Sequence, residues 1–171
     1  MGIRAYRWGT KIAERGSTPV RVRVGDEYVP AEKGYHVALS ANRESILKHG
    51  IDYRTGETGS RHVFEDYVDA YGFIPRKGNY IWLNKDDALG IAKPGIHDIW
   101  EVAIPESRRD KFFYDRSVGG GQAAQSPTKI PKRDLTLHMV EGPINPEHMK
   151  RFGPLIERAK NRLSEQQFRE D

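Results

Sequence analysis

Two ring-bearing residues and one amide-rich segment are the first candidates for chemistry in this sequence. His36 lies in GYHVALSANRESILKHGID, which predicts a strand and then a helix that ends at Gly50. A histidine ring can hydrogen-bond a ligand hydroxyl. Tyr80 begins the apolar stretch GNYIWL. Lone histidines are more often structural and strand aromatics usually pack across strands, so the residues alone leave both interpretations open.

The third candidate is the segment that follows FFYDRS. Asp115, within FFYDRS itself, lies just before this segment. Its glycine-rich stretch VGGGQAAQSPTK carries Gln122 and Gln125. We expect residues 119–127 to form a mobile loop, since glycines and small polar residues bury little apolar area to offset their ordering entropy. Irregular loops on rigid scaffolds often carry function, although a solvated linker is the simpler interpretation of this stretch alone.

Several chemistries are excluded by composition and spacing. The chain has no cysteine, so it has no disulfide, thiolate metal ligand or cysteine nucleophile. The six histidines do not fall at zinc-binding spacing, and we expect no metal. GGGQ matches neither the GxGxxG nor the GxxxxGK[ST] phosphate-binding pattern. The acidic residues are scattered, so no catalytic carboxylate pair can be assigned.

Length and charge predict one domain in a cytoplasmic protein. A chain of 171 residues suits a single core. The absence of cysteine fits a reducing compartment, and neither a signal peptide nor an apolar run of about 18 residues is present. Lys and Arg total 28 against 24 Asp and Glu, a net charge of +4 that mildly favours polyanionic partners.

Hydrophobic periodicity predicts mostly strands with a few short helices, and therefore an α+β fold with a curved, partly antiparallel sheet. Ser40 or Asn42 can cap the helix after the first strand, which should turn Ile46 and Leu47 inward. We expect a hairpin addition within residues 1–33, a core over 34–140, and a C-terminal helix and charged tail over 141–171, with a candidate break near Gly153 and Pro154. The other expected elements are a hairpin over 19–29, strands over 34–39, 78–83, 97–104 and 135–140, and helices over 61–72 and 85–92.

Taken together, the motifs resemble those of the ADP-ribosyltransferase superfamily. YHVALSANRESILKHGI is similar to its first motif and NYIWLNKDDALGIA to its second. HDIWEVAIP, KFFYDRS and IPKRDLTLHMV are similar to later parts of the small rifampicin-modifying and toxin-type members and, more distantly, of the tRNA 2'-phosphotransferases. The resemblance covers about residues 34–140. It implies a curved, mostly antiparallel split sheet with short flanking helices.

The resemblance also implies an NAD site. By matching position, His36 would hydrogen-bond the adenosine-side ribose of NAD and Tyr80 would stack on the nicotinamide. Val37 and Ala38, which replace the family's Gly-Thr, would lie beside the cofactor, and Arg54 is a further candidate for cofactor contact.

The third motif differs from the family pattern. Many members use a glutamate on a late strand, whereas GGGQAAQSPTKIP offers Gln125 or Gln122, which can hydrogen-bond but cannot act as a general base. Asp115 is an alternative acid. We expect an NAD-dependent ADP-ribosyltransferase, with Tyr80, Asp115 and Gln125 as catalytic residues, that releases nicotinamide and modifies a protein or a nucleic acid.

Two other functions stay open at this point. An RNA 2'-phosphotransferase-like enzyme would place Arg54, Arg61 and Arg116 on RNA phosphate, but those enzymes carry a histidine where this chain has Tyr80. A non-catalytic member would bind NAD, ADP-ribose or nucleic acid; the missing acid favours it and the pair His36 and Tyr80 opposes it. The acceptor and the oligomeric state cannot be inferred from the sequence.

Overall fold

The structure, a computed structural model, describes residues 29, 31–54, 78–115 and 122–170. The expected helix over 61–72 lies outside these residues. The expected hairpin over 19–29 also does, apart from Val29, which is fully buried in the core.

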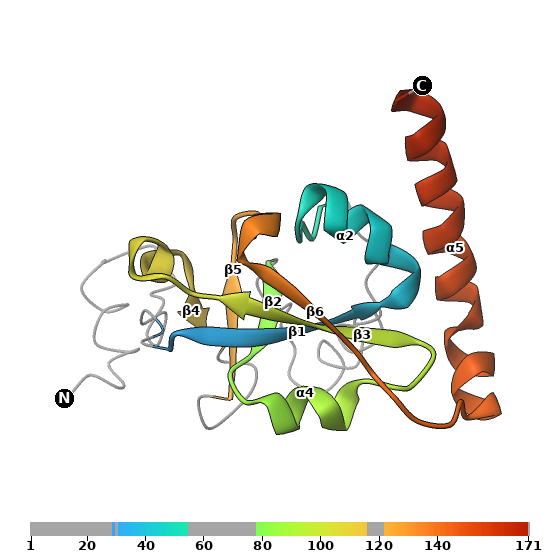
Figure 1. Ribbon diagram of the computed structural model, residues 1–171, viewed down its shortest axis with the longest axis horizontal. Coiled ribbons are helices and arrows are strands. Elements are labelled where there is room, and N and C mark those ends of the chain that lie inside the picture. The colour runs from blue at the N-terminus through green and yellow to red at the C-terminus, as the bar shows by residue number, and fades with distance from the viewer. Residues whose placement is uncertain (1–28, 30, 55–77, 116–121, 171) are drawn as a thin grey trace, which may run out of the picture.

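The described residues form one six-stranded antiparallel sheet with short helices packed around it (Figure 1). The strand order is β4-β5-β2-β1-β3-β6. The mixed α+β class is therefore confirmed, as are the four expected strands, with small shifts of their ends. The strands are β1 (Lys33–Leu39), β2 (Asn79–Trp82), β3 (His97–Ala103), β4 (Phe113–Tyr114), β5 (Ala123–Ser126) and β6 (Leu135–Met139).

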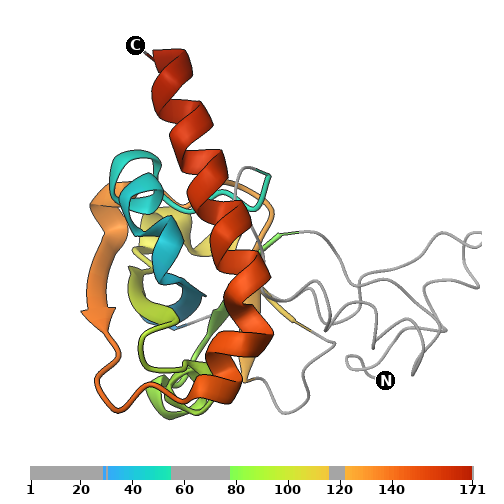
Figure 2. The same cartoon turned by 90° about the vertical axis from the view of Figure 1, so that its right-hand side faces the viewer.

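Helices α2 and α4 cover opposite faces of the sheet, and α5 lies along one end and extends beyond it (Figures 1 and 2). The helix α2 ends at Gly50, whose φ of 81° is a conformation that few other residues adopt. The helices are η1 (Ser40–Asn42), α2 (Arg43–His49), α4 (Lys85–Ile91), η2 (Glu106–Lys111), η4 (Lys132–Asp134) and α5 (Pro146–Glu170), where η marks a 3₁₀-helix.

The sheet consists of two well-paired halves that meet at a narrow junction. β1 pairs with β3 along its whole length, and β2 pairs with β5 from Asn79 to Trp82. Between the halves, the register pair recorded for β1 and β2 is Tyr35 with Trp82. β5 runs steeply across the direction of β1 and β3 in Figure 1. Where strands diverge, some backbone groups have no partner on the next strand and must be bonded by side chains. The candidate site lies at this junction.

Two clusters of buried side chains attach the helices to the sheet. Trp100, Val102 and Ile104 of the β3 region pack with Ile46 of α2 and with Ile81 of β2. The second cluster brings α5 into the core, and it consists of Leu39, Ile96, Leu155, Ile156 and Ala159.

Three sequence expectations about helices need correction. Asn42 precedes α2, but its side chain makes no capping hydrogen bond, and Ser40 lies within η1. Ile46 is buried, but Leu47 is 53% exposed, because the two-turn helix α2 turns only a narrow side toward the sheet. The helix α5 runs unbroken from Pro146 to Glu170, with Pro154 inside it. Its neighbours Leu155 and Ile156 are buried against Leu39 and Ile96, and this packing offsets the hydrogen bond that a proline removes.

The expected mobile loop over 119–127 is wrong for residues 123–126. These residues form β5, which is buried and lies between β2 and β4. The segment AAQS has no β-branched or aromatic residue, so its composition did not indicate a strand. Pairing on both sides overrides this weak local preference. Residues 119–121 lie outside the described part of the chain.

Among the residues that the structure describes, none of the helices combines the length and the apolar character that crossing a bilayer requires.

We expect His97 to make the fold sensitive to mild acid. Its Nδ1 accepts a hydrogen bond from the Lys93 backbone N–H at 2.9 Å, and its ring meets Phe152 of α5 edge-on. Burial, reinforced by the charge of Lys93, lowers the pKa of His97 to about 4. Since the unfolded chain binds a proton near pH 6.5 and the folded chain does not, stability is full above pH 6.5 and is lost as the pH falls toward 4.

Urea unfolding at two pH values tests this prediction. The free energy of unfolding should fall by about 2 kcal/mol between pH 7 and pH 5. His97→Asn keeps an acceptor for the Lys93 N–H but does not titrate, so the part of the decrease that His97 contributes should disappear, and His36, whose pKa burial also lowers, contributes to what remains. An unchanged pH dependence in this variant would show that another group is responsible.

Candidate functional site

The imidazole of His36 is bonded across the junction to the backbone of β2. Its Nδ1 lies 2.6 Å from the carbonyl oxygen of Tyr80. Because a carbonyl only accepts, Nδ1 carries the proton and donates. Burial lowers the pKa of His36, and the bond to Tyr80 opposes this only in part. The ring is therefore neutral near pH 7, in the tautomer that leaves Nε2 as a hydrogen-bond acceptor.

Tyr80 is aligned with Gln125 across the outer half of the sheet. The two residues are register partners, and Gln125 is also the partner of Phe113 in β4. Directly opposite residues of antiparallel strands point to the same face, so these three side chains form one row. The sheet pairing thus places an aromatic ring, an amide and a second aromatic ring side by side.

Asp115 lies next to this row. Its backbone N–H donates to the carbonyl of Ala123 at 2.9 Å, which continues the pairing of β4 with β5, and the residue is 8% exposed. Burial raises the pKa of Tyr80 well above its usual value, and the negative charge of Asp115 adds to the effect. The Tyr80 hydroxyl therefore stays protonated at physiological pH, so Tyr80 can act as a ring and a donor but not as a base.

The amide of Gln125 has an unsatisfied acceptor. The residue is 4% exposed, and its Oε1 has no hydrogen-bond partner among the described residues. The backbone of Gly78 lies close by, since a Cβ at Gly78 would stand 2.9 Å from this oxygen. A buried acceptor without a donor costs about 1–3 kcal/mol. A ligand that brings a hydroxyl or amide N–H to Gln125 would remove that cost.

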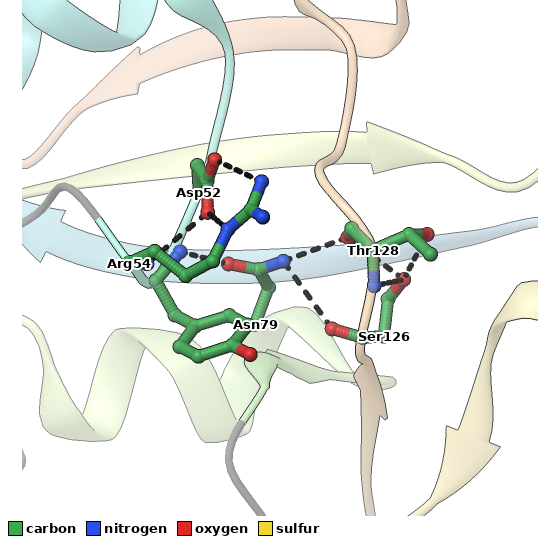
Figure 3. Close-up of polar contacts among 6 residues, drawn as sticks. Asp52, Arg54, Asn79, Ser126 and Thr128 are labelled. Atoms are coloured by element: carbon green, nitrogen blue, oxygen red, sulfur yellow. Dashed lines mark hydrogen bonds and ion pairs between the residues drawn. The ribbon is translucent and has the colours of Figure 1, made fainter.

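Asn79, which sequence reasoning missed, holds this region together (Figure 3). Its Oδ1 accepts from the backbone N–H of Tyr53 at 2.6 Å. Its Nδ2 donates to the carbonyls of Ser126 at 3.2 Å and Thr128 at 2.8 Å. One side chain therefore ties β2 to β5 and to the segment after α2. The available signal was an amide inside the apolar strand GNYIWL, a position where burial requires bonded partners.

Replacing Asn79 by alanine should lower the free energy of unfolding by about 2 kcal/mol, because the Tyr53 N–H and the buried Ser126 carbonyl each lose a bond, and the Thr128 carbonyl keeps only its bond from Ser126 Oγ. Urea denaturation measures the effect. The control is Asn84→Ala at the start of α4, where the exposed side chain accepts one bond from Asp86 N–H and the expected loss is about 1 kcal/mol. Equal losses in the two variants would contradict the role given to Asn79.

The other candidate residues are placed as follows. Val37 and Ala38 are partly buried in β1 and pack against two different clusters of the core. The Arg54 side chain is 65% exposed and forms a two-point ion pair with Asp52, shown in Figure 3. Gln122 is exposed. Arg61 and Arg116 lie outside the described residues. The structure thus brings Tyr80, Asp115 and Gln125 together on one face of the outer half-sheet, and His36 is linked to them through the backbone carbonyl of Tyr80.

Within the described residues, no group of three or more His, Asp or Glu side chains is arranged to hold a metal ion. No protein-family model matches the chain, and no curated protein matches it either. The geometry of the junction is therefore the observation that bears on function.

Proposed function

We propose that this chain is an NAD-dependent ADP-ribosyltransferase with an ADP-ribosyltransferase-like fold, which transfers ADP-ribose to an acceptor macromolecule and releases nicotinamide. The observation that carries the proposal is the junction between the half-sheets. Residues that the resemblance assigns to one NAD site come from β1, β2, β5 and the end of β4, and they are connected there: the His36 ring bonds the backbone carbonyl of Tyr80, Tyr80 is opposite Gln125, and Asp115 lies beside Tyr80.

Each group suits one part of NAD. The Nε2 of neutral His36 can accept from a ribose hydroxyl, and the ring of Tyr80 can stack on nicotinamide. The unsatisfied Oε1 of Gln125 can accept from a hydroxyl of the nicotinamide-side ribose or from the carboxamide of nicotinamide. Val37, Ala38 and Arg54 remain candidates for further cofactor contacts.

Under this proposal, the bond between ribose C1' and the nicotinamide nitrogen breaks, and its electron pair leaves with nicotinamide. Positive charge develops on the ribose, and the carboxylate of Asp115 stabilises it. A nucleophilic oxygen or nitrogen of the acceptor then bonds to C1' and loses its proton. Gln125 cannot take that proton, so Asp115 is the proposed proton acceptor.

The amide of Gln125 favours a second candidate, a non-catalytic member that binds NAD or ADP-ribose. Such a protein would use the same His36, Tyr80 and Gln125 contacts but would leave the glycosidic bond intact. The RNA 2'-phosphotransferase alternative has less support, since Arg54 already shares its charge with Asp52.

Calorimetric titration with NAD tests the site. His36→Ala should weaken NAD binding by about tenfold, since an acceptor for a ribose hydroxyl is lost. His36→Gln, whose amide can still donate to the Tyr80 carbonyl, separates the ligand contact from any effect on folding. The control is His138→Ala on β6, which should bind NAD as the parent does. Equal affinity in the parent and both His36 variants would show that the assignment is wrong.

A further inference from the structure

Two short segments carry most of the net positive charge of the chain. They are η2 (Glu106–Lys111) and residues 129–134, which include η4. Together they contain six basic and three acidic side chains, a net charge of +3, whereas the whole chain has +4. The six basic residues, which we call the basic surface, are Arg108, Arg109, Lys111, Lys129, Lys132 and Arg133.

An ion pair between Arg108 and Asp134 brings the two segments together. Burial, and then the nearby positive charge of Arg133, lowers the pKa of Arg108. Positive side chains from the two segments are therefore close enough to repel each other. Lys129, Lys132 and Arg133 are exposed, so an external anion can reach them. Binding such an anion would relieve the repulsion.

The backbone under these cations is rigidly held. Ile130 is 2% exposed and exchanges two backbone hydrogen bonds with Ile51, each of 2.9 Å. Gly50 approaches so closely that a Cβ there would lie 2.3 Å from the Ile130 carbonyl oxygen. Figure 1 shows the orange η4 turn on the same side of the sheet as α2, and the two elements are in contact. The backbone that carries Lys129, Lys132 and Arg133 is thus held in place before any ligand binds, which lowers the entropic cost of binding.

The basic surface begins at the edge of the candidate site. Lys129 directly follows Thr128, whose carbonyl is bonded by Asn79, and both belong to the segment that continues from Gln125 in β5. The pKa of Asp52 is lowered first by its hydrogen bonds from Arg54 and further by the charge of Lys129. The basic surface is therefore continuous along the chain with β5 and lies next to the segment that Asn79 holds.

We propose that the basic surface binds the phosphate backbone of a nucleic acid. Regularly spaced phosphates match several clustered cations better than an isolated acidic side chain does. Under the proposed function, on which this step rests, the nucleic acid is the acceptor of ADP-ribose. The binding itself does not depend on NAD chemistry.

Fluorescence anisotropy with labelled single-stranded RNA and DNA of about 20 nucleotides tests the proposal. If about three phosphates are neutralised, affinity should fall by about twentyfold between about 50 and 200 mM salt. The double variant Lys132→Glu/Arg133→Glu should bind at least about tenfold more weakly and show a shallower salt dependence. A matched control, Lys85→Glu/Lys150→Glu, has the same change of charge but on α4 and α5, and should stay within about threefold of the parent.

Comparing the two probes shows whether the ligand is RNA or DNA. The proposal is overturned if the parent does not bind either probe, if its affinity does not change with salt, or if both double variants weaken binding equally. NAD titration of the same samples keeps the two proposals distinguishable. Nucleic-acid binding without NAD binding would support the role of the basic surface and show that the proposed function is wrong. NAD binding without nucleic-acid binding would overturn only the role given to the basic surface.

Discussion

Replacing Tyr80 by alanine is expected to slow nicotinamide release from NAD by about 100-fold, which corresponds to about 2.7 kcal/mol of transition-state stabilisation. The ring is the group that would hold nicotinamide flat while the glycosidic bond lengthens. Tyr80→Phe keeps this ring and should retain most of the rate. The hydroxyl is not expected to act as a base, because burial and Asp115 raise the pKa of Tyr80 far above neutrality.

Chromatographic measurement of nicotinamide over time compares the three proteins at saturating NAD. Thermal unfolding of each variant, followed by circular dichroism, shows whether the fold is intact. A parental rate in Tyr80→Ala would contradict the stacking role. A rate in Tyr80→Phe as low as that of the alanine variant would show that the hydroxyl, rather than the ring, is required.

The second large effect concerns the attachment of α2 to the sheet. Nε and Nη2 of Arg43 donate to the two carboxylate oxygens of Asp98 at 2.8 and 2.7 Å. The Asp98 side chain is only 1% exposed. In Arg43→Gln, a buried carboxylate loses its counter-charge, and the free energy of unfolding should fall by about 3–5 kcal/mol. Urea denaturation at pH 7 measures the change.

Arg54→Gln provides the matched control for this prediction. It removes a similar two-point ion pair, with Asp52, but the Arg54 side chain is 65% exposed. Exposed pairs contribute about 0–1 kcal/mol, so the expected loss is small. Equal losses in the two variants would mean that the burial of Asp98 is not what makes its pairing important.

The strands β1, β3 and β6 and the helix α4 were predictable from the sequence because local signals agree with the fold there. β1 contains Tyr35 and Val37, and β3 contains Ile99, Trp100 and Val102, which are residue types that favour strands. Asn84 precedes α4, and its side chain accepts the Asp86 N–H as a helix cap should. In these segments local preference and tertiary packing lead to the same structure.

β5 could not be predicted because its strand structure depends on neighbours distant in the sequence. Its residues are alanine, glutamine and serine, and β2 and β4 supply the pairing. The direction of Leu47 likewise depends on where α2 lies on the sheet. Composition indicates the local preference of a segment, whereas the conformation and burial of these residues depend on the elements packed around them.

For the candidate site, the motifs indicated which residues to examine but not how they meet. His36 contacts Tyr80 through the backbone carbonyl rather than through the ring, a detail of the diverging strands that no sequence pattern records. The burial of Gln125 with an unsatisfied oxygen, and the bonds of Asn79 to three residues of two other segments, also depend on how β2 pairs with β5.

The most direct test of the central claim is a titration of the purified full chain with NAD, followed by chromatography of the same sample for free nicotinamide. We expect saturable binding and slow nicotinamide release, with release accelerated by addition of a nucleic-acid acceptor. Binding without release, even when the acceptor is added, would favour the non-catalytic alternative. No binding at millimolar NAD would contradict the site formed by His36, Tyr80 and Gln125.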